Sequence, residues 1–542
     1  MRKHLNRWSI LTLVFALLLT VPLWVLVSFM FEPTNDNWTH LADTLLPEYI
    51  INSLWLMLGV TIGTLLLGVP TAWVISQYRF VGKSVLHWAL LLPMAMPAYI
   101  IAYTYTGLLE FEGPVQTALR TVFDTQTVNL WFPEVRSLGG AIVMFSLVLY
   151  PYVYLLARTS FANQSQSVMH ASRTLGAGPY KTFFKVALPI ARPAIIAGLT
   201  LALMETLADF GTVQHFGVPT FTTGIYRTWS GFGDTTTAAQ LSILLLLFVV
   251  ALMVIEVWSR KQAKYFTGNA QPLNQVLPKL KGKHALAAFS LCLLPIVFGF
   301  ILPALQLLDW SINVASTALN AEFITLVWNS FSLAFITALV TVSIALLFLY
   351  LKRLHNTPII DQSVRIAGLG YAIPGTVIAV AVIIPLAWFD NTLDSWAREH
   401  LDISTGLLLS GTLFALVFAY CFRFLSVALQ SIQSGLSQIK PSMDESAKTL
   451  GANHWTILKR IHIPLLSSSL VTAFLLVFVE VLKELPTTLI LRPFNFNTLA
   501  VRAYEMAADE RLADAGLPAL LIVMTGLIPV IILSKMIGKR HA

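Results

Sequence analysis

Long apolar segments without a charged residue recur along this 542-residue chain and constrain its fold more than any other feature. A helix needs about 20 apolar residues to cross the roughly 30 Å hydrocarbon layer of a membrane. The segments that reach this length without Asp, Glu, Lys or Arg are 8–31, 49–78, 84–109, 137–157, 235–255, 285–308, 323–351, 366–389, 403–422 and 515–534. Two shorter segments, 193–204 and 461–479, precede acidic residues and are interpreted as spans with acidic outer ends. The sequence therefore predicts an all-α integral membrane protein with twelve transmembrane helices.

The composition excludes several classes of protein. The chain is 56% hydrophobic and only 11% charged, whereas soluble domains are about 25% charged. A soluble enzyme, a disordered tail and a nucleic-acid-binding domain are therefore excluded, and lipid is the expected surroundings. The net charge is +8. Most Lys and Arg residues fall on one side of the twelve spans if the N-terminus is cytoplasmic, so both termini are expected in the cytoplasm.

Two local features have a plain interpretation. The first apolar segment follows Arg2, Lys3 and Arg7, as in a signal peptide, but it is too long and lacks a small-residue cleavage site, so it is expected to be the first span. Cys292 and Cys421 both lie in apolar segments. They form no disulfide framework and match no metal-binding spacing, so no resident metal or cofactor is expected.

The chain contains the same unit twice. Thr-Leu-Gly-Ala stands at 174–177 and again at 449–452, an offset of 275 residues, and a proline follows each glycine at the same spacing. The expected halves are 1–259 and 285–542, joined by a basic cytoplasmic linker at 260–284. Six spans in each half give both halves the same orientation. We therefore expect two tandem six-helix repeats related by a pseudo-twofold axis along the membrane normal.

The repeated segments 170–189 and 445–464 are predicted to form a helix, a glycine turn and a second amphipathic helix outside the bilayer. A single copy would be explained by a helix resting on lipid headgroups. Two copies with fixed spacing on one face favour paired docking elements for a cytoplasmic partner with twofold symmetry. A proline at the start of the next span suits a first helical turn in each copy.

These segments resemble the EAA loop of ABC-importer permeases, which the ATP-hydrolysing subunits bind. The resemblance implies coupling roles for His170, Ala171, Leu175, Gly176, Ala177, Phe183 and Pro189, and for Glu445, Ser446, Leu450, Gly451, Ala452, Ile457 and Pro464. The first copy has His170 where the family has Glu, and the second copy has Ser446 where it has Ala. The two ATPase contacts are therefore expected to be unequal.

Further segments are similar to ferric-iron importer permeases, namely 150–154, 203–213 and 221–227. This resemblance implies a bacterial inner-membrane permease that passes Fe³⁺ from a periplasmic binding protein to the cytoplasm. It implies a cytoplasmic ATPase homodimer as the motor, with ATP and Mg²⁺ on that partner. No Walker A sequence occurs in this chain, so ATP hydrolysis is not expected here. Thiamine, polyamine or phosphonate remain alternative cargoes, and a gradient-driven secondary transporter is an alternative class.

Four acids repeat with the same offset and are the candidate translocation path. Glu205 and Asp209 pair with Glu480 and Glu484, and each pair is spaced i, i+4, on one helix face. Acidic groups within membranes usually face a bundle interior or a watery cavity, and hard oxygen donors suit a hard cation. The alternative is that these acids mark span ends at the outer headgroups, with Lys483 neutralising one of them.

Other repeated or clustered residues have weaker interpretations. Tyr99, Tyr103 and Tyr105 are expected in an interfacial aromatic belt rather than in the path. Arg227 and Arg502 are expected in polar outer loops. Proline at positions 93, 97 and 374 is expected to kink the third and ninth spans. His87 and His462 are expected near the membrane interface rather than as ligands.

Overall fold

The computed structural model describes residues 7–123, 132–162, 164, 172, 174, 176, 178–261, 277–355 and 357–539. Among these residues the fold is all-helical, with an isolated β-bridge between Arg79 and Lys279. Within these ranges, ten helices are long and apolar enough to cross a membrane, or eleven if a bent pair counts as one span. A shorter apolar helix, Gly516–Ile532, lies where the twelfth span is expected.

Within the described residues, the first half contains fifteen helical elements. They are α1 (Arg7–Ser28), η1 (Phe29–Phe31), α2 (Asp36–Thr44), α3 (Leu46–Gln77), α4 (Lys83–Ala89), η2 (Leu92–Ala95), α5 (Ala98–Leu109), α6 (Pro114–Phe123), α7 (Leu138–Ala162), α9 (Pro179–Thr182), η4 (Phe183–Ala187), α10 (Leu188–Ala208), α11 (Gly211–His215), α12 (Phe221–Phe232) and α13 (Thr235–Lys261).

The second half repeats this order. Its elements are α14 (Gly282–Ile296), η5 (Val297–Ile301), α15 (Leu302–Ala318), α16 (Ala321–His355), α17 (Pro358–Ala367), η6 (Gly368–Ala372), α18 (Gly375–Leu401), α19 (Leu413–Leu436), α20 (Pro441–Thr449), α21 (His454–Ile457), η7 (Leu458–His462), α22 (Ile463–Leu482), α23 (Pro486–Leu491), α24 (Leu499–Ala508) and α25 (Gly516–Lys539).

Several equivalent helices of the two halves start 275 residues apart, the same offset as in the sequence repeat. The five-residue π-helices η4 and η7 start at Phe183 and Leu458, and the helices α10 and α22 that follow start at Leu188 and Ile463. Short 3₁₀ elements, η2 and η6, interrupt the corresponding third span of each half. In the first half this span bends by 92° between Ala95 and Ala98. The break has a direct cause, because prolines 93 and 97 remove backbone donors there.

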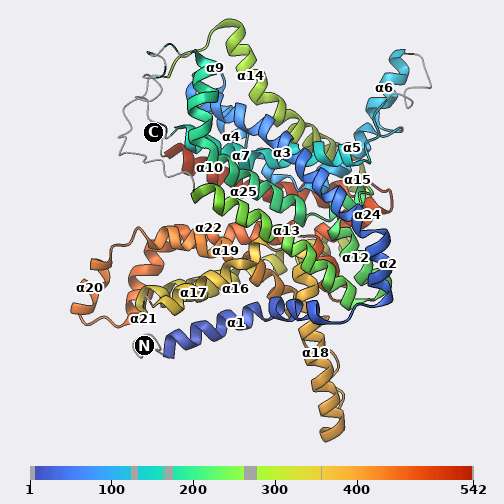
Figure 1. Ribbon diagram of the computed structural model, residues 1–542, viewed down its shortest axis with the longest axis vertical. Coiled ribbons are helices and arrows are strands. Elements are labelled where there is room, and N and C mark those ends of the chain that lie inside the picture. Colours follow the sequence, from blue (N-terminus) through green and yellow to red (C-terminus); the bar gives the residue numbers. More distant parts are fainter. Residues whose placement is uncertain are drawn as a thin grey trace.

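The halves exchange their first helices. Helix α1 packs on α16 and α17 of the second half, where Phe15 meets Phe348 edge-on at 6.0 Å between ring centroids and Ser9 hydrogen-bonds Thr357. In the other direction α15 lies against α5 of the first half, and the Tyr105 hydroxyl donates to the Phe298 carbonyl of η5, which precedes α15. Figure 1 shows α1 beside α16 and α17, across the molecule from α4. Residues 1–259 therefore do not pack as a self-contained bundle.

Apolar side chains remain on the outside of the long helices. Leu66 on α3 and Ile324 on α16 are 65% and 68% exposed. In a soluble protein such a surface would aggregate, whereas lipid is its natural solvent. The buried core lies where the halves meet and is formed by segments such as 377–382 of α18, whose side chains are fully buried.

Candidate functional site

The second repeated segment forms the predicted helix, turn and helix. Gly451 adopts φ +83°, the left-handed conformation that glycine takes at helix ends, and α20 stops there. Glu445, Ser446 and Leu450 are exposed, and Leu450 is 88% exposed at the turn. Ile457 is buried and anchors the second helix. Ala452 closes the turn by donating its N–H to the Ala447 carbonyl, and Pro464 lies in the first turn of α22.

An ion pair that the sequence did not indicate fastens this segment to the helical body. Asp444 of α20 accepts from Arg353 Nε of α16 at 2.7 Å and lies 2.8 Å from His462 Nε2 of η7. Arg353 also donates to the Leu436 and Ile439 carbonyls at the end of α19. Burial raises the pKa of Asp444, but hydrogen bonds from Arg353 and His462 outweigh it and lower the pKa below its ordinary value.

The first repeated segment is held differently. Gly176 adopts the same left-handed conformation, at φ +79°. Phe183 packs against Trp73 at 5.1 Å between ring centroids, and Pro189 lies in the first turn of α10. Tyr180 projects with 82% of its surface exposed. The remaining predicted coupling residues of this copy, His170, Ala171, Leu175 and Ala177, lie outside the described residues.

The four repeated acids line one cavity. Glu205, Asp209, Glu480 and Glu484 all contribute to a cavity of about 110 Å³, which we call the acid chamber. The ends of η2, α10 and α22 surround it. The long helices α10 and α22 both end in this region, and a short helix follows each of them. Among the residues that the structure describes, no group of three or more His, Cys, Asp or Glu side chains gathers closely enough to hold a metal ion. The acids therefore surround a space rather than form a compact ligand cluster.

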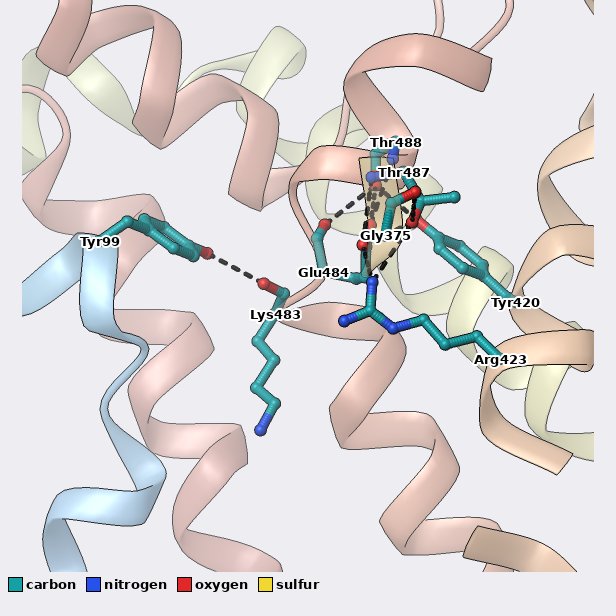
Figure 2. A network of polar contacts seen from close by, with 8 residues as sticks. All are labelled: Tyr99, Gly375, Tyr420, Arg423, Lys483, Glu484, Thr487 and Thr488. Atoms are coloured by element: carbon teal, nitrogen blue, oxygen red, sulfur yellow. Dashed lines mark hydrogen bonds and ion pairs between the residues drawn. The ribbon is translucent and has the colours of Figure 1, made fainter. Parts of the chain in front are cut away.

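The acids at positions 209 and 484 have a structural function as helix caps. Asp209 accepts from the Thr212 backbone N–H at 2.8 Å and from its hydroxyl at 3.0 Å. Glu484 accepts from the backbone N–H and hydroxyl groups of Thr487 and Thr488 (Figure 2). Each acid thus satisfies the first free N–H groups of the short helix that follows it, α11 or α23.

The other two acids differ from each other in their partners. Lys483 Nζ lies 2.8 Å from Glu480 Oε1. Glu205 instead accepts from the Tyr371 hydroxyl at 3.3 Å, a longer and uncharged hydrogen bond. Glu484 is also neutralised, because Arg423 Nη1 lies 2.7 Å from its Oε1 (Figure 2).

This difference follows from the sequence of the two halves. At the 275-residue offset, Ala208 and Val148 occupy the positions of Lys483 and Arg423. The first half therefore supplies acids without the bases that accompany them in the second half. The hydrogen bond that Glu205 accepts comes from a phenol, the Tyr371 hydroxyl.

Aromatic side chains close one side of the chamber. The rings of Tyr99 and Tyr103 are tilted by 55° with their centroids 5.7 Å apart, and the centroids of Phe210 and Tyr504 are also 5.7 Å apart. We call these four residues the aromatic plug. Tyr99, Tyr103 and Tyr105 are all buried, so the expectation of an aromatic belt at the lipid interface is wrong. The reason is that α5 is covered by α11 and α15.

An ion-pair cluster lies beyond the plug. Arg136 donates Nε to Glu110 of the first half, and its two Nη groups donate to both oxygens of Glu510 of the second half at 2.7 and 2.6 Å. A cavity of about 170 Å³ lies between Arg136, Glu510, Tyr103 and Tyr504. Hydrogen bonds from Arg136 lower the pKa of Glu510, so this cluster is charged at neutral pH.

A larger cavity lies on the other side of the chamber, toward α20. This inner vestibule has a volume of about 840 Å³ and is lined mainly by α19 and α22. Tyr152 lines both the chamber and the vestibule, and Tyr371 lines the vestibule while donating to Glu205. Tyr152 and Tyr371 therefore separate the two spaces. From the sequence, Tyr152 was noted only as part of the segment 150–154, and nothing indicated a functional role for Tyr371.

The structure also shows where the predicted arginines, His462 and the two cysteines lie. Arg227 and Arg502 lie in helices α12 and α24 rather than in loops, and Arg502 lies 3.5 Å from Glu322. His462 is buried rather than interfacial. Both cysteines are free and buried.

Comparison with known proteins identifies the family. The model of the family "Binding-protein-dependent transport system inner membrane component" matches residues 64–263 and again residues 353–541. The chain belongs to this family. The two matches confirm the internal repeat and the resemblance to importer permeases.

Individual relatives agree with this assignment. The Fe(3+)-transport system permease protein FbpB 2 of Haemophilus influenzae is 27% identical over 493 residues, covering 90% of each chain. The ferric transport system permease protein FbpB of Actinobacillus pleuropneumoniae is 22% identical over 540 residues, covering 94% of this chain and 72% of that one. The molybdenum transport system permease protein ModB of Haemophilus influenzae is 27% identical over 98% of its own length but only 40% of this chain, as expected if one of its chains corresponds to one half.

Proposed function

We propose that this protein is the permease subunit of an ABC importer that translocates ferric iron from a periplasmic binding protein to the cytoplasm. The names of the FbpB relatives and their coverage of nearly the whole chain support iron as the cargo. The observation that carries the proposal is the acid chamber, because four carboxylates line a single cavity between the two repeats. Carboxylate oxygens stabilise a hard cation and repel anions.

The organisation proposed for the membrane follows from the repeat. The chain crosses the bacterial inner membrane twelve times, with α4 to α5 as one broken span and α25 as the last. The two halves are related by a pseudo-twofold axis along the membrane normal, and both termini lie in the cytoplasm. In support, the start of α1 and the end of α25 lie on the same side of the molecule as α9, α20 and α21 (Figure 1).

The repeated segments are the proposed docking elements for a homodimer of ATP-binding subunits. Leu450 and Trp455 in one copy and Tyr180 and Phe184 in the other are large apolar side chains that are exposed. Each segment continues through a π-helix directly into α10 or α22, whose far ends place Glu205 and Glu480 in the chamber. Movement of an ATPase subunit would therefore be transmitted along one continuous helix to each acid.

Within the chamber, the Lys483 ammonium takes the position beside Glu480 that the cargo cation occupies during transport. It neutralises Glu480 in the absence of iron, so the chamber does not bear an uncompensated cluster of negative charge. An entering cation interacts first with Glu205 and then competes with the Lys483 ammonium for Glu480. The chamber volume of about 110 Å³ holds a metal ion with several water molecules.

The conformation described here is closed on the outer side and open toward the inner vestibule. The aromatic plug and the Arg136 cluster close the outer side, whereas Gln430, Ser434 and Gln438 of the vestibule are exposed. ATP-driven approach of the two docking segments is proposed to open the outer side and to close the vestibule.

Reconstitution tests the proposal. The permease is placed in proteoliposomes with its ATPase and the binding protein, and uptake of radiolabelled ferric iron is measured with and without ATP. We expect uptake that requires ATP and that is lost in the Glu205→Gln, Glu480→Gln double variant while the ATPase still co-purifies. Normal uptake by that variant contradicts the role of the acids. Uptake that persists without ATP but requires an ion gradient would favour a secondary transporter, and uptake of thiamine or polyamine in place of iron would change the cargo.

A further inference from the structure

The inner vestibule is chemically one-sided. Eight Ser, Thr and Gln residues that line it come from the second half, namely Ser426, Gln430, Ser431 and Ser434 of α19, Gln438 just after it, and Ser468, Ser469 and Thr472 of α22. Ser426, Gln430 and Ser434 are spaced four residues apart and so share one helix face. Tyr152 and Leu201 are the lining residues of the first half. The hydroxyl and amide groups of serine, threonine and glutamine in this lining thus all come from the second half, which also contributes apolar residues such as Val427 and Leu476.

The first half lacks this polar face. Its helices α7 and α10 begin 275 residues before α19 and α22, so equivalent positions can be read directly. Pro151 and Leu155 stand where α19 has Ser426 and Gln430, and Pro193 and Ala197 stand where α22 has Ser468 and Thr472. Thr159, at the position of Ser434, and Asn163, at the position of Gln438, are the polar counterparts. A duplicated protein has therefore diverged at the positions that face its inner cavity.

Helix packing explains only part of this polar set. Polar residues in membrane helices often hold neighbouring helices together. Ser431 does so by donating to the Ser469 carbonyl, at the place where α19 and α22 approach most closely at Gly435. In contrast, Gln430 donates to Ser426 of its own helix, and Thr472 donates to the Ser468 carbonyl of its own helix. Gln430, Ser434 and Ser468 line the cavity and remain exposed, so contact with another helix does not account for them.

The vestibule carries hydroxyl and amide groups but no acid. The lining residues include no Asp, Glu, Lys, Arg or His among those that the structure describes. Neutral oxygens stabilise a hydrated cation weakly, whereas carboxylates would retain it. A cation that has left Glu205 therefore meets a surface that replaces part of its water without trapping it.

We propose that the cargo cation leaves the acid chamber past Tyr152 and Tyr371 and moves to the cytoplasm along the polar face of α19 and α22, so that exit uses the second half alone. This inference rests on the proposed function for the identity of the cargo. The route itself is a property of the cavity and can be tested without knowing the cargo.

Cysteine accessibility tests the route. Gln430→Cys and Thr472→Cys are compared with their first-half counterparts Leu155→Cys and Ala197→Cys, in a full-length chain in which Cys292 and Cys421 are alanine. Inside-out vesicles are treated with a positively charged, membrane-impermeant methanethiosulfonate. We expect the second-half thiols to react at least about tenfold faster, because thiol reactivity requires exposure to water. Modified second-half variants should also lose ATP-dependent iron uptake, and modified first-half variants should keep it.

The outcomes separate the route from the cargo. Equal reaction rates in the two halves, or full uptake after complete modification of Gln430→Cys, would overturn the proposal. If the unmodified protein transports no iron, the proposed function fails, and the reaction rates alone still decide the route. Folding is checked by co-purification of the ATPase, which a blocked but intact exit leaves unchanged.

Discussion

The buried pair between Arg423 and Glu484 provides the sharpest quantitative prediction. Their side chains are 13% and 3% exposed, and the carboxylate also accepts from Thr487 and Thr488 (Figure 2). In Glu484→Gln one oxygen becomes an NH₂ group that faces these donors, and the Arg423 charge loses its partner. Breaking a buried ion pair in this way costs about 3–5 kcal/mol in the free energy of unfolding.

Replacing both partners should recover most of that loss. In the Arg423→Met, Glu484→Gln double variant no uncompensated charge remains, so the free energy of unfolding should return to within about 1–2 kcal/mol of the natural protein. Unfolding is followed by circular dichroism in mixed micelles at increasing denaturing detergent. Asp514→Asn serves as the control, because its pair with Arg511 is exposed and breaking it should cost at most about 1 kcal/mol. A double variant as unstable as the sum of the two single variants would refute the reasoning.

Three further predictions concern transport and docking. Glu205→Gln should reduce iron uptake by about tenfold or more, since it removes a chamber carboxylate whose hydrogen-bond donor is the uncharged Tyr371 hydroxyl. Asp209→Asn should keep most uptake because Asn also caps a helix; equal losses in a transport assay would contradict the division of roles. Leu450→Asp should abolish co-purification of the ATPase because it places a charge on an exposed apolar docking side chain, while Phe494→Asp, at a fully exposed position between α23 and α24, should have no effect. Arg136→Gln should raise ATP hydrolysis in the absence of binding protein because it releases the outer closure. The pKa of Glu510 is lowered in the folded protein, so its ion pair with Arg136 is fully formed above the unfolded pKa of about 4.3 and weakens only as pH falls through the lower folded value. The difference in ATP hydrolysis between Arg136→Gln and the natural protein should therefore be constant from about pH 5 to 8.

The internal repeat and the apolar segments could be predicted from the sequence because they depend on local chemistry. The Thr-Leu-Gly-Ala turns could be predicted because a left-handed residue at the end of a helix favours glycine, and Gly176 and Gly451 both adopt that conformation. The breaks at positions 93 and 97 could be predicted because proline lacks an N–H. The four acids could be paired because the offset is constant between 174 and 509.

Contacts between distant segments were not readable. Nothing in the sequence around Tyr371 indicates that it meets Glu205, which is 166 residues away along the chain. The burial of Tyr99 to Tyr105 was mispredicted because tyrosine is equally suited to an interface and to a packed helix pair, and only the position of α15 decides between them. Asp444 lies next to the predicted Glu445, yet its partner Arg353 is 91 residues earlier.

The exchange of first helices has a consequence for biosynthesis. Ser9 of α1 meets Thr357, 348 residues later in the chain. Translation adds about 5–20 residues per second, so α1 waits roughly 20–70 s after its own synthesis before its partner leaves the ribosome. During that interval, only lipid or an insertion factor can cover the face of α1 that later packs against α17. If translation stops before α17 is made, α1 does not acquire this packing partner.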